Sequence, residues 1–188
     1  METLTASYAA QRKIADLLDD IRAALRRYLV IGEFQFVTLA LYVIHTHAIG
    51  VGSEEGLYPY HTCYLNITSP VKRSGKTRVL EVLSLLVGRP WFCSMTTTAA
   101  LVRRIQNEQP TLLLDETDRA FTGDRDYANK LTGILNAGYT RKGSVWMCEG
   151  KALINRPGSG MCFVRKCFQG SGTNTCQIRC LIARFPSR

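Results

Sequence analysis

The last 38 residues of this 188-residue chain contain no aspartate or glutamate, although they hold 7 of its 24 lysines and arginines. A formal net charge of +9 would indicate a nucleic acid or an anionic membrane as partner if it were spread evenly. Residues 1–150 instead carry 17 basic and 15 acidic residues, so this part of the chain is nearly neutral. The charge therefore does not by itself predict nucleic-acid binding by the body of the protein.

Cysteine is scarce in the same body, which holds only Cys63, Cys93 and Cys148. Three scattered cysteines exclude a disulfide framework and are typical of reduced, structural thiols. A secretory leader is also lacking, because residues 1–20 are polar and helical in pattern, with no apolar stretch before a cleavage site. We therefore expect a cytoplasmic protein.

No hydrophobic run is long enough to span a membrane. The most apolar segment, residues 34–49, is short and contains His45 and His47, so we expect a buried helix there. Two histidines at this spacing could suggest a metal pair, but residues two apart on a helix point to different faces. Structural histidines with their own hydrogen-bond partners are the favoured interpretation.

Helical and strand patterns alternate along the chain. An amphipathic helix and the apolar helix form an N-terminal helical segment, residues 1–56, and a core follows at residues 57–150. Strands that alternate with helices predict a mostly parallel, three-layer α/β sheet. The expected helices are residues 14–28, 34–49, 77–87, 96–106 and 126–139, and the expected strands are residues 62–68, 91–94, 111–115 and 144–148.

A phosphate-binding loop is indicated where the first strand meets the next helix. Residues 70–77 read PVKRSGKT, which fits the P-loop pattern at its last three positions but has Pro70 where the first glycine is usual. Gly75 lets backbone N–H groups approach a phosphate, Lys76 can reach the β and γ oxygens, and the Thr77 hydroxyl can hold Mg²⁺. A plain helix start on a basic turn is the alternative. The expected nucleotide-binding residues are Pro70, Val71, Lys72, Arg73, Ser74, Gly75, Lys76 and Thr77.

The complementary acidic pair follows an apolar strand. Residues 111–116 read TLLLDE, and a parallel sheet would deliver both acids to the edge where the loop lies. Asp115 would hold Mg²⁺ through water, and Glu116 would deprotonate the attacking water, the role that ATP hydrolysis requires. An ordinary strand that ends in a solvated acidic turn is the alternative. Asp118 and Arg119 could support these groups, although a capped turn explains them equally well.

Two features favour the additional-strand, catalytic-glutamate division of P-loop NTPases, which includes AAA+ and RecA-like motors. The strand at residues 91–94 intervenes between the two motifs, and Glu116 directly follows Asp115. Kinase-like P-loop enzymes are therefore disfavoured. Arg141 is a weaker candidate for contacting phosphate across a subunit interface, and a solvated arginine at a helix end is an equal alternative.

A closer resemblance is carried by the segments HTHAI, YLNITSPVKRSGKTRVLEVL, RPWF, PTLLLDETD and LTGILNAGYTRKGSVWMCEGK. Over residues 17–151 the chain resembles a family of P-loop ATPases known as a domain of unknown function, of the DUF thirty-six thirty-one type. The family occurs in bacterial, phage and mobile-element proteins, some joined to primase or helicase-like parts, and Ser-Pro commonly opens its loop. The resemblance implies ATP hydrolysis with Mg²⁺ as cofactor, coupling to DNA work through the parent protein, and a homo-oligomer as one possible assembly.

Beyond residue 151 the resemblance stops, where the family continues with a pattern like FCPK..GIG..LPDT..DRSIPI. Translating the tail backwards and shifting by one base permits CPKMFSGIGNEHLPDTVSDRSIPIT from Phe163 onward. We interpret residues 151–188 as the product of a single-base frameshift. The P-loop sandwich would then be incomplete at its C-terminus, the ATPase impaired, and the tail irregular, leaving the strand at residues 62–68 with an unpaired edge or a makeshift partner.

The alternative for this tail is a basic nucleic-acid module that binds zinc. Its four cysteines have spacings that fit no common zinc knuckle. The frameshift interpretation is therefore favoured over a zinc site. The cysteines concerned are Cys162, Cys167, Cys176 and Cys180.

Overall fold

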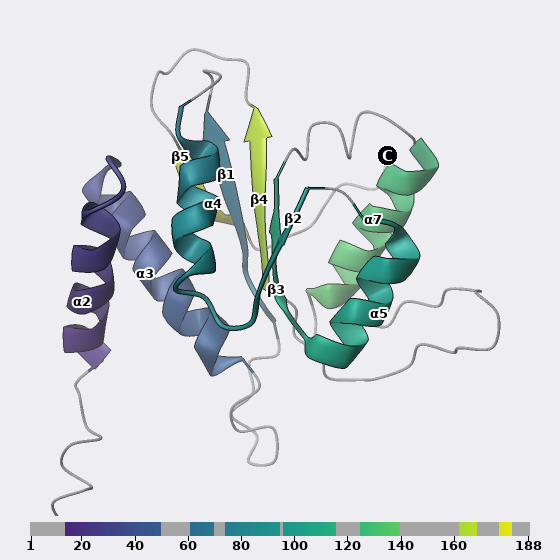
Figure 1. Cartoon of the computed structure of the whole chain (residues 1–188), viewed down its shortest axis with the longest axis horizontal. Helices are drawn as coiled ribbons and strands as arrows, with labels where there is room; N and C mark the ends of the chain where they lie inside the picture. Colours follow the sequence, from purple (N-terminus) through teal and green to yellow (C-terminus); the bar gives the residue numbers. More distant parts are fainter. Residues whose placement is uncertain are drawn as a thin grey trace, which may run out of the picture.

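The computed structural model describes residues 14–49, 61–69, 74–94, 96–115 and 125–139, together with the backbone of residues 162–168 and 177–181. These residues form five helices and five strands in a mixed α/β arrangement (Figure 1). The predicted α/β class is therefore confirmed.

The strands form one sheet in the order β2-β3-β4-β1-β5. All neighbouring pairs are parallel except β1 and β5, which run antiparallel. The sheet is thus mostly parallel, as expected from the alternation of strands and helices. The strands are β1 (Tyr64–Ser69), β2 (Pro90–Cys93), β3 (Thr111–Leu114), β4 (Cys162–Phe168) and β5 (Gln177–Leu181).

Strands β1 and β3 are almost entirely buried, because both of their faces are covered. Leu65 and Leu113 are fully buried in one hydrophobic cluster, whereas Tyr64 and Leu112 belong to a second cluster. Alternate residues of a strand point to opposite faces, so the two clusters lie on opposite sides of the sheet.

Helices cover both of these faces. Side chains of α2, α3 and α4 enter the first cluster, and those of α5 and α7 enter the second. Figure 1 shows the first three helices to the left of the sheet and the other two to its right. The helices are α2 (Ile14–Arg26), α3 (Glu33–Ala48), α4 (Lys76–Ser84), α5 (Thr98–Glu108) and α7 (Arg125–Gly138).

Helix α3 corrects one prediction, because it is not buried all round. Phe36, Leu39 and Val43 are buried, but Phe34 is 80% exposed and Leu41 is 52% exposed. None of the described helices has the length and apolar character needed to cross a membrane.

The tail differs from its expected irregular structure in two stretches. Two alternative outcomes were expected for β1, an unpaired edge or a makeshift partner. Strands β4 and β5 flank β1 on its two sides, so the unpaired edge does not occur. The predicted strand at residues 144–148 lies outside the described residues.

The position of β2 also refines the expected topology. This strand lies between β1 and β3 along the chain, but in space it occupies an edge of the sheet. The strand that separates β1 from β3 in space is β4. Chain order therefore did not reveal which strand is inserted between the two motif-bearing strands.

Candidate functional site

The sequence-predicted phosphate loop begins where β1 ends, at the buried residue Ser69. Residues 70–73 lie outside the described part, and the chain is described again from Ser74. Gly75 then adopts φ 81° and ψ 10°, the left-handed region that favours glycine. An ideal Cβ at Gly75 would meet no heavy atom within 4 Å, so the requirement for glycine is conformational rather than steric.

Helix α4 starts directly after this glycine with Lys76, which is only 6% exposed. Its ammonium Nζ donates a hydrogen bond to Ser74 Oγ at 3.1 Å. A buried lysine is rare, and a cation in the first turn of a helix opposes the helix dipole. An anion bound at the start of α4 would meet both this ammonium and the N-terminus of the helix.

Asp115 immediately follows β3 and is 8% exposed. Its backbone N–H donates to the carbonyl of Cys93 at 3.0 Å, which holds this residue against the end of β2. Leu113 faces the cluster that contains α4, and the two-residue period of a strand directs Asp115 to the same side. A buried carboxylate is thus placed beneath the layer to which α4 belongs.

Parallel pairing brings these groups to one edge of the sheet. Both β1 and β3 run parallel to β4, so their carboxyl ends point to the same edge of the sheet, and two strand spacings with a stagger of three residues separate the Cα atoms of Ser69 and Leu114 by about 14 Å. Figure 1 shows the arrowheads of β1 and β4 pointing the same way. Lys76 and Thr77 follow one of these ends, and Asp115 follows the other. Ligands of open α/β sheets bind at this kind of edge.

Several predicted site residues have no described geometry. Glu116 lies outside the described residues, as do the first four residues of the loop. The weaker candidates Asp118, Arg119 and Arg141 also lie outside the described residues. The roles predicted for all of these residues stay predictions. These residues are Pro70, Val71, Lys72, Arg73, Asp118, Arg119 and Arg141.

The oxygen donors that remain are suitable for Mg²⁺. The Thr77 hydroxyl lies in the first turn of α4 and is half-buried, and Asp115 supplies a buried carboxylate. Magnesium prefers hydroxyl, carboxylate, phosphate and water oxygens, so both donors fit the ion.

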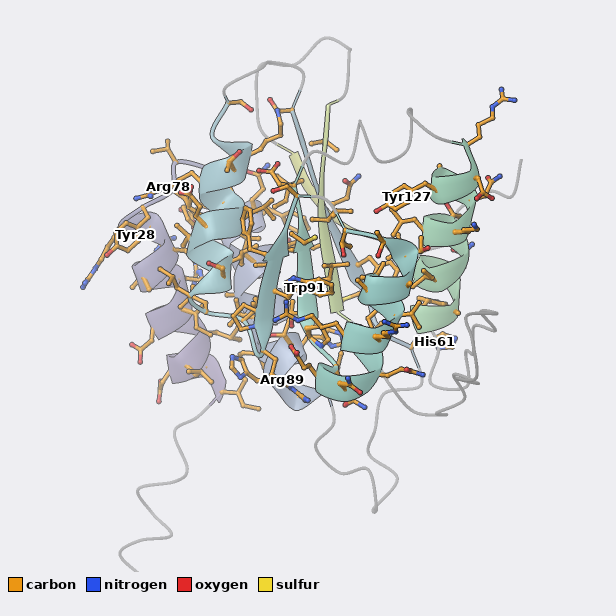
Figure 2. All side chains as sticks on the ribbon, turned by 45° about the vertical axis from the view of Figure 1, so that its right-hand side comes forward. Tyr28, His61, Arg78, Arg89, Trp91 and Tyr127 are labelled. Atoms are coloured by element: carbon orange, nitrogen blue, oxygen red, sulfur yellow. The ribbon has the colours of Figure 1, made fainter. Side chains whose placement is uncertain are left out.

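Tyr127 of α7 contributes a feature that the motifs did not predict. Its hydroxyl donates to the carbonyl of Thr96 at 2.9 Å, which fastens α7 to the segment after β2 (Figure 2). Burial raises the pKa of Tyr127, and the nearby Cys93 raises it further. No local pattern could have revealed this contact, because it joins residues 31 positions apart.

The opposite end of β1 is fixed by histidine contacts. His45 Nε2 lies 3.0 Å from Thr62 Oγ1, and the Thr62 N–H donates to the carbonyl of Tyr139. The His61 ring lies 4.8 Å from the Tyr139 ring. Burial lowers the pKa of His45, so the neutral ring is favoured there.

His47 uses a separate partner, since its Nε2 lies 2.8 Å from the carbonyl oxygen of Leu86. The two α3 histidines therefore serve different contacts, which agrees with their interpretation as structural residues. The His45 contact supports β1 from the end away from the phosphate loop, whereas the His47 contact joins α3 to the turn after α4.

Comparison with known proteins gives no match to any protein-family model and no match to a curated protein. The family resemblance carried by the sequence motifs therefore stays a hypothesis.

Proposed function

We propose that the carboxyl edge of this sheet binds a nucleoside triphosphate, ATP, together with Mg²⁺. The observation that carries the proposal is the buried Lys76 at the N-terminus of α4, on the same edge as the buried Asp115. A buried cation and a buried carboxylate at one edge of the sheet suit a ligand that brings phosphates and a metal cation.

Each group has a defined role in this proposal. Gly75 permits close approach of backbone N–H groups to phosphate, and Lys76 exchanges its bond to Ser74 for the β and γ oxygens. Thr77 and Asp115 would hold Mg²⁺, which neutralises charge on the phosphates when bound. Glu116, adjacent to Asp115 in the chain, would accept the proton of the attacking water.

The strand order supports a P-loop NTPase fold of the additional-strand division. Strand β4 is inserted between β1, which leads to the loop, and β3, which leads to Asp115. We propose that the parent domain is an ATPase that acts in DNA replication or mobile-element DNA processing, as the resemblance implies. If residues 151–188 are the product of a frameshift, as the sequence indicates, this chain is an impaired fragment of that domain.

The zinc alternative receives no support from the strand registers. Cys167 is level with Thr68 of β1, whereas Cys180 is level with Leu65 on the other side of the same strand. Two strand spacings and three residues of rise separate their Cα atoms by about 14 Å. Cysteines that share a tetrahedral zinc, with Zn–S bonds of about 2.3 Å, must lie much closer together.

Calorimetric titration with ATP and Mg²⁺ tests the proposal. Lys76→Ala should weaken binding by about 30-fold or more, because a charge-assisted bond to phosphate contributes about 2 kcal/mol. Lys130→Ala is the matched control, since Lys130 is exposed on α7 and pairs with Asp126. Equal affinities for the chain and its Lys76→Ala variant would refute the assignment.

Hydrolysis needs a separate test on a protein whose reading frame has been restored. Glu116→Gln should keep ATP bound but lower turnover, because the amide retains the shape and cannot take the proton. Full turnover in that variant would remove Glu116 from the mechanism.

A further inference from the structure

The outward side of α3 carries an apolar stripe that nothing in the described structure covers. Phe34, Val37 and Leu41 are 80%, 37% and 52% exposed, and Ala48 at the end of the helix is also exposed. Steps of three, four and seven residues keep these four side chains on one helix face. The stripe is about 21 Å long and lies opposite the buried face of Phe36, Leu39 and Val43.

Charge on and around this stripe narrows the choice of partner. Residues 34–48 contain no aspartate, glutamate, lysine or arginine, so the helix offers nothing to nucleic acid or to an anionic lipid surface. At the N-terminal end of α3, Glu33 pairs with Arg22 and Arg26 of α2, and Arg22 also pairs with Asp19. Two positive and two negative charges balance there, so a second copy would meet no net repulsion.

The sizes of the side chains also suit a second copy in one orientation. Leu41 lies midway between the bulky Phe34 and the small Ala48. An antiparallel pair of α3 helices therefore places Phe34 opposite Ala48 of the other copy and Leu41 opposite Leu41. Large residues facing small ones pack without voids, and antiparallel helix dipoles attract. A parallel pair would oppose two phenylalanines and leave two alanines facing each other.

We propose that the stripe formed by Phe34, Val37, Leu41 and Ala48 is a self-association surface, through which two copies of this chain pair as antiparallel α3 helices about a two-fold axis. A two-fold interface uses the same patch on both copies, which the balanced charge and the large-to-small gradient of α3 permit. The surface is distant in the chain from the phosphate loop, so it does not depend on the proposed nucleotide site.

Sedimentation velocity of the full chain over a concentration series tests the pairing. The chain should form a dimer, and Leu41→Glu should weaken dimerisation by about 100-fold or more, because two like charges would face each other at the axis. Leu85→Glu is the matched control, since Leu85 is 83% exposed at the end of α4 and should leave the dimer intact. Circular dichroism establishes that each variant keeps its helices.

A charge-pair variant tests the orientation. Phe34→Glu alone should weaken the dimer, and F34E/A48K should restore it to within about 10-fold, because antiparallel pairing places the new glutamate opposite the new lysine. A monomeric chain would overturn the proposal. So would a dimer that tolerates a folded Leu41→Glu or Phe34→Glu variant, or a folded F34E/A48K variant that stays as weak as the single change.

Discussion

Gly75 adopts a left-handed backbone conformation, which is unfavourable for any residue that has a Cβ. This unfavourable free energy determines the expected effect of a substitution. Its φ is 81°, and space for a Cβ is open, so Gly75→Ala should lower the free energy of unfolding by about 1 kcal/mol through strain alone. Gly133 lies inside α7 with equally open space, so Gly133→Ala should raise it by about 1 kcal/mol.

Urea denaturation of the two variants measures these opposite changes in the free energy of unfolding. A Gly75→Ala variant that is as stable as the unmodified chain, or more stable, would show that the left-handed turn before α4 is not maintained in solution. The same pair of variants also separates loop geometry from global stability, since only Gly75→Ala should reduce ATP-Mg affinity.

The half-buried His45 gives the fold a dependence on pH. Its pKa is lowered in the folded protein, so the stability that it contributes is present above the unfolded pKa of 6.5 and is lost as pH falls through the lowered folded value. The loss on going from neutral to mildly acidic pH should not exceed about 1 kcal/mol, because solvent still reaches the ring.

Comparing His45→Gln with the unmodified chain in urea denaturation at neutral and acidic pH isolates this contribution. The variant should show the weaker pH dependence, whereas His47→Gln serves as control for a histidine of the same helix. The assignment of a lowered pKa to His45 would be wrong if the unmodified chain became more stable at acidic pH and the His45→Gln variant did not.

Residues of the site could be inferred from sequence to the extent that they belong to local motifs. Lys76, Thr77 and Asp115 follow predicted strands, and parallel pairing brings them to one edge. The bond from Lys76 to Ser74 and the bond from Tyr127 to Thr96 could not be inferred, because side-chain rotamers and tertiary approach decide them.

At the scale of elements, periodicity predicted where helices and strands form. The amphipathic pattern placed α2, and the helices expected at residues 96–106 and 126–139 correspond to α5 and α7. The sequence of α3 is apolar almost all round, and such a helix is expected to be buried on every side. The structure instead leaves Phe34 and Leu41 exposed. Composition cannot distinguish a face buried within one chain from a face that meets another.

The N-cap of α5 supplies a prediction at this scale. Thr97 has extended backbone angles, and its side chain accepts a hydrogen bond from the N–H of Ala100 at 3.2 Å. Thr97→Ala should lower the free energy of unfolding by about 1 kcal/mol, whereas Thr97→Ser should retain most of it. Thermal denaturation of the pair checks this expectation, and equal losses in both would mean that the methyl group, not the hydroxyl, matters.

At the scale of the whole molecule, the sheet joins segments that no local pattern could connect. Strand β1 pairs with β4, almost 100 residues later in the chain, and the tail was expected to be irregular. That expectation followed from the frameshift interpretation of residues 151–188, which also explains why they lack acids and are rich in cysteine and arginine. The pairing of strands in the tail does not establish in which reading frame the gene was translated. The frameshift interpretation therefore stays a hypothesis, which the coding nucleotide sequence can decide.

The contributions of the two tail strands can be separated by truncation. A chain that ends at residue 168 keeps β4, which hydrogen-bonds to both β1 and β3, and loses only the edge strand β5. A chain that ends at residue 161 loses both strands, so no main-chain hydrogen bonds would join the strand leading to Lys76 with the strand leading to Asp115. The first should still unfold cooperatively with a lower midpoint, and the second should lose its cooperative transition, because two separate short ladders are marginal in water.

Urea denaturation followed by circular dichroism compares the two truncated chains. A cooperative transition at an unchanged midpoint in the shorter chain would show that β1 and β3 are held together without β4, and the edge that carries Lys76 and Asp115 would then need another explanation.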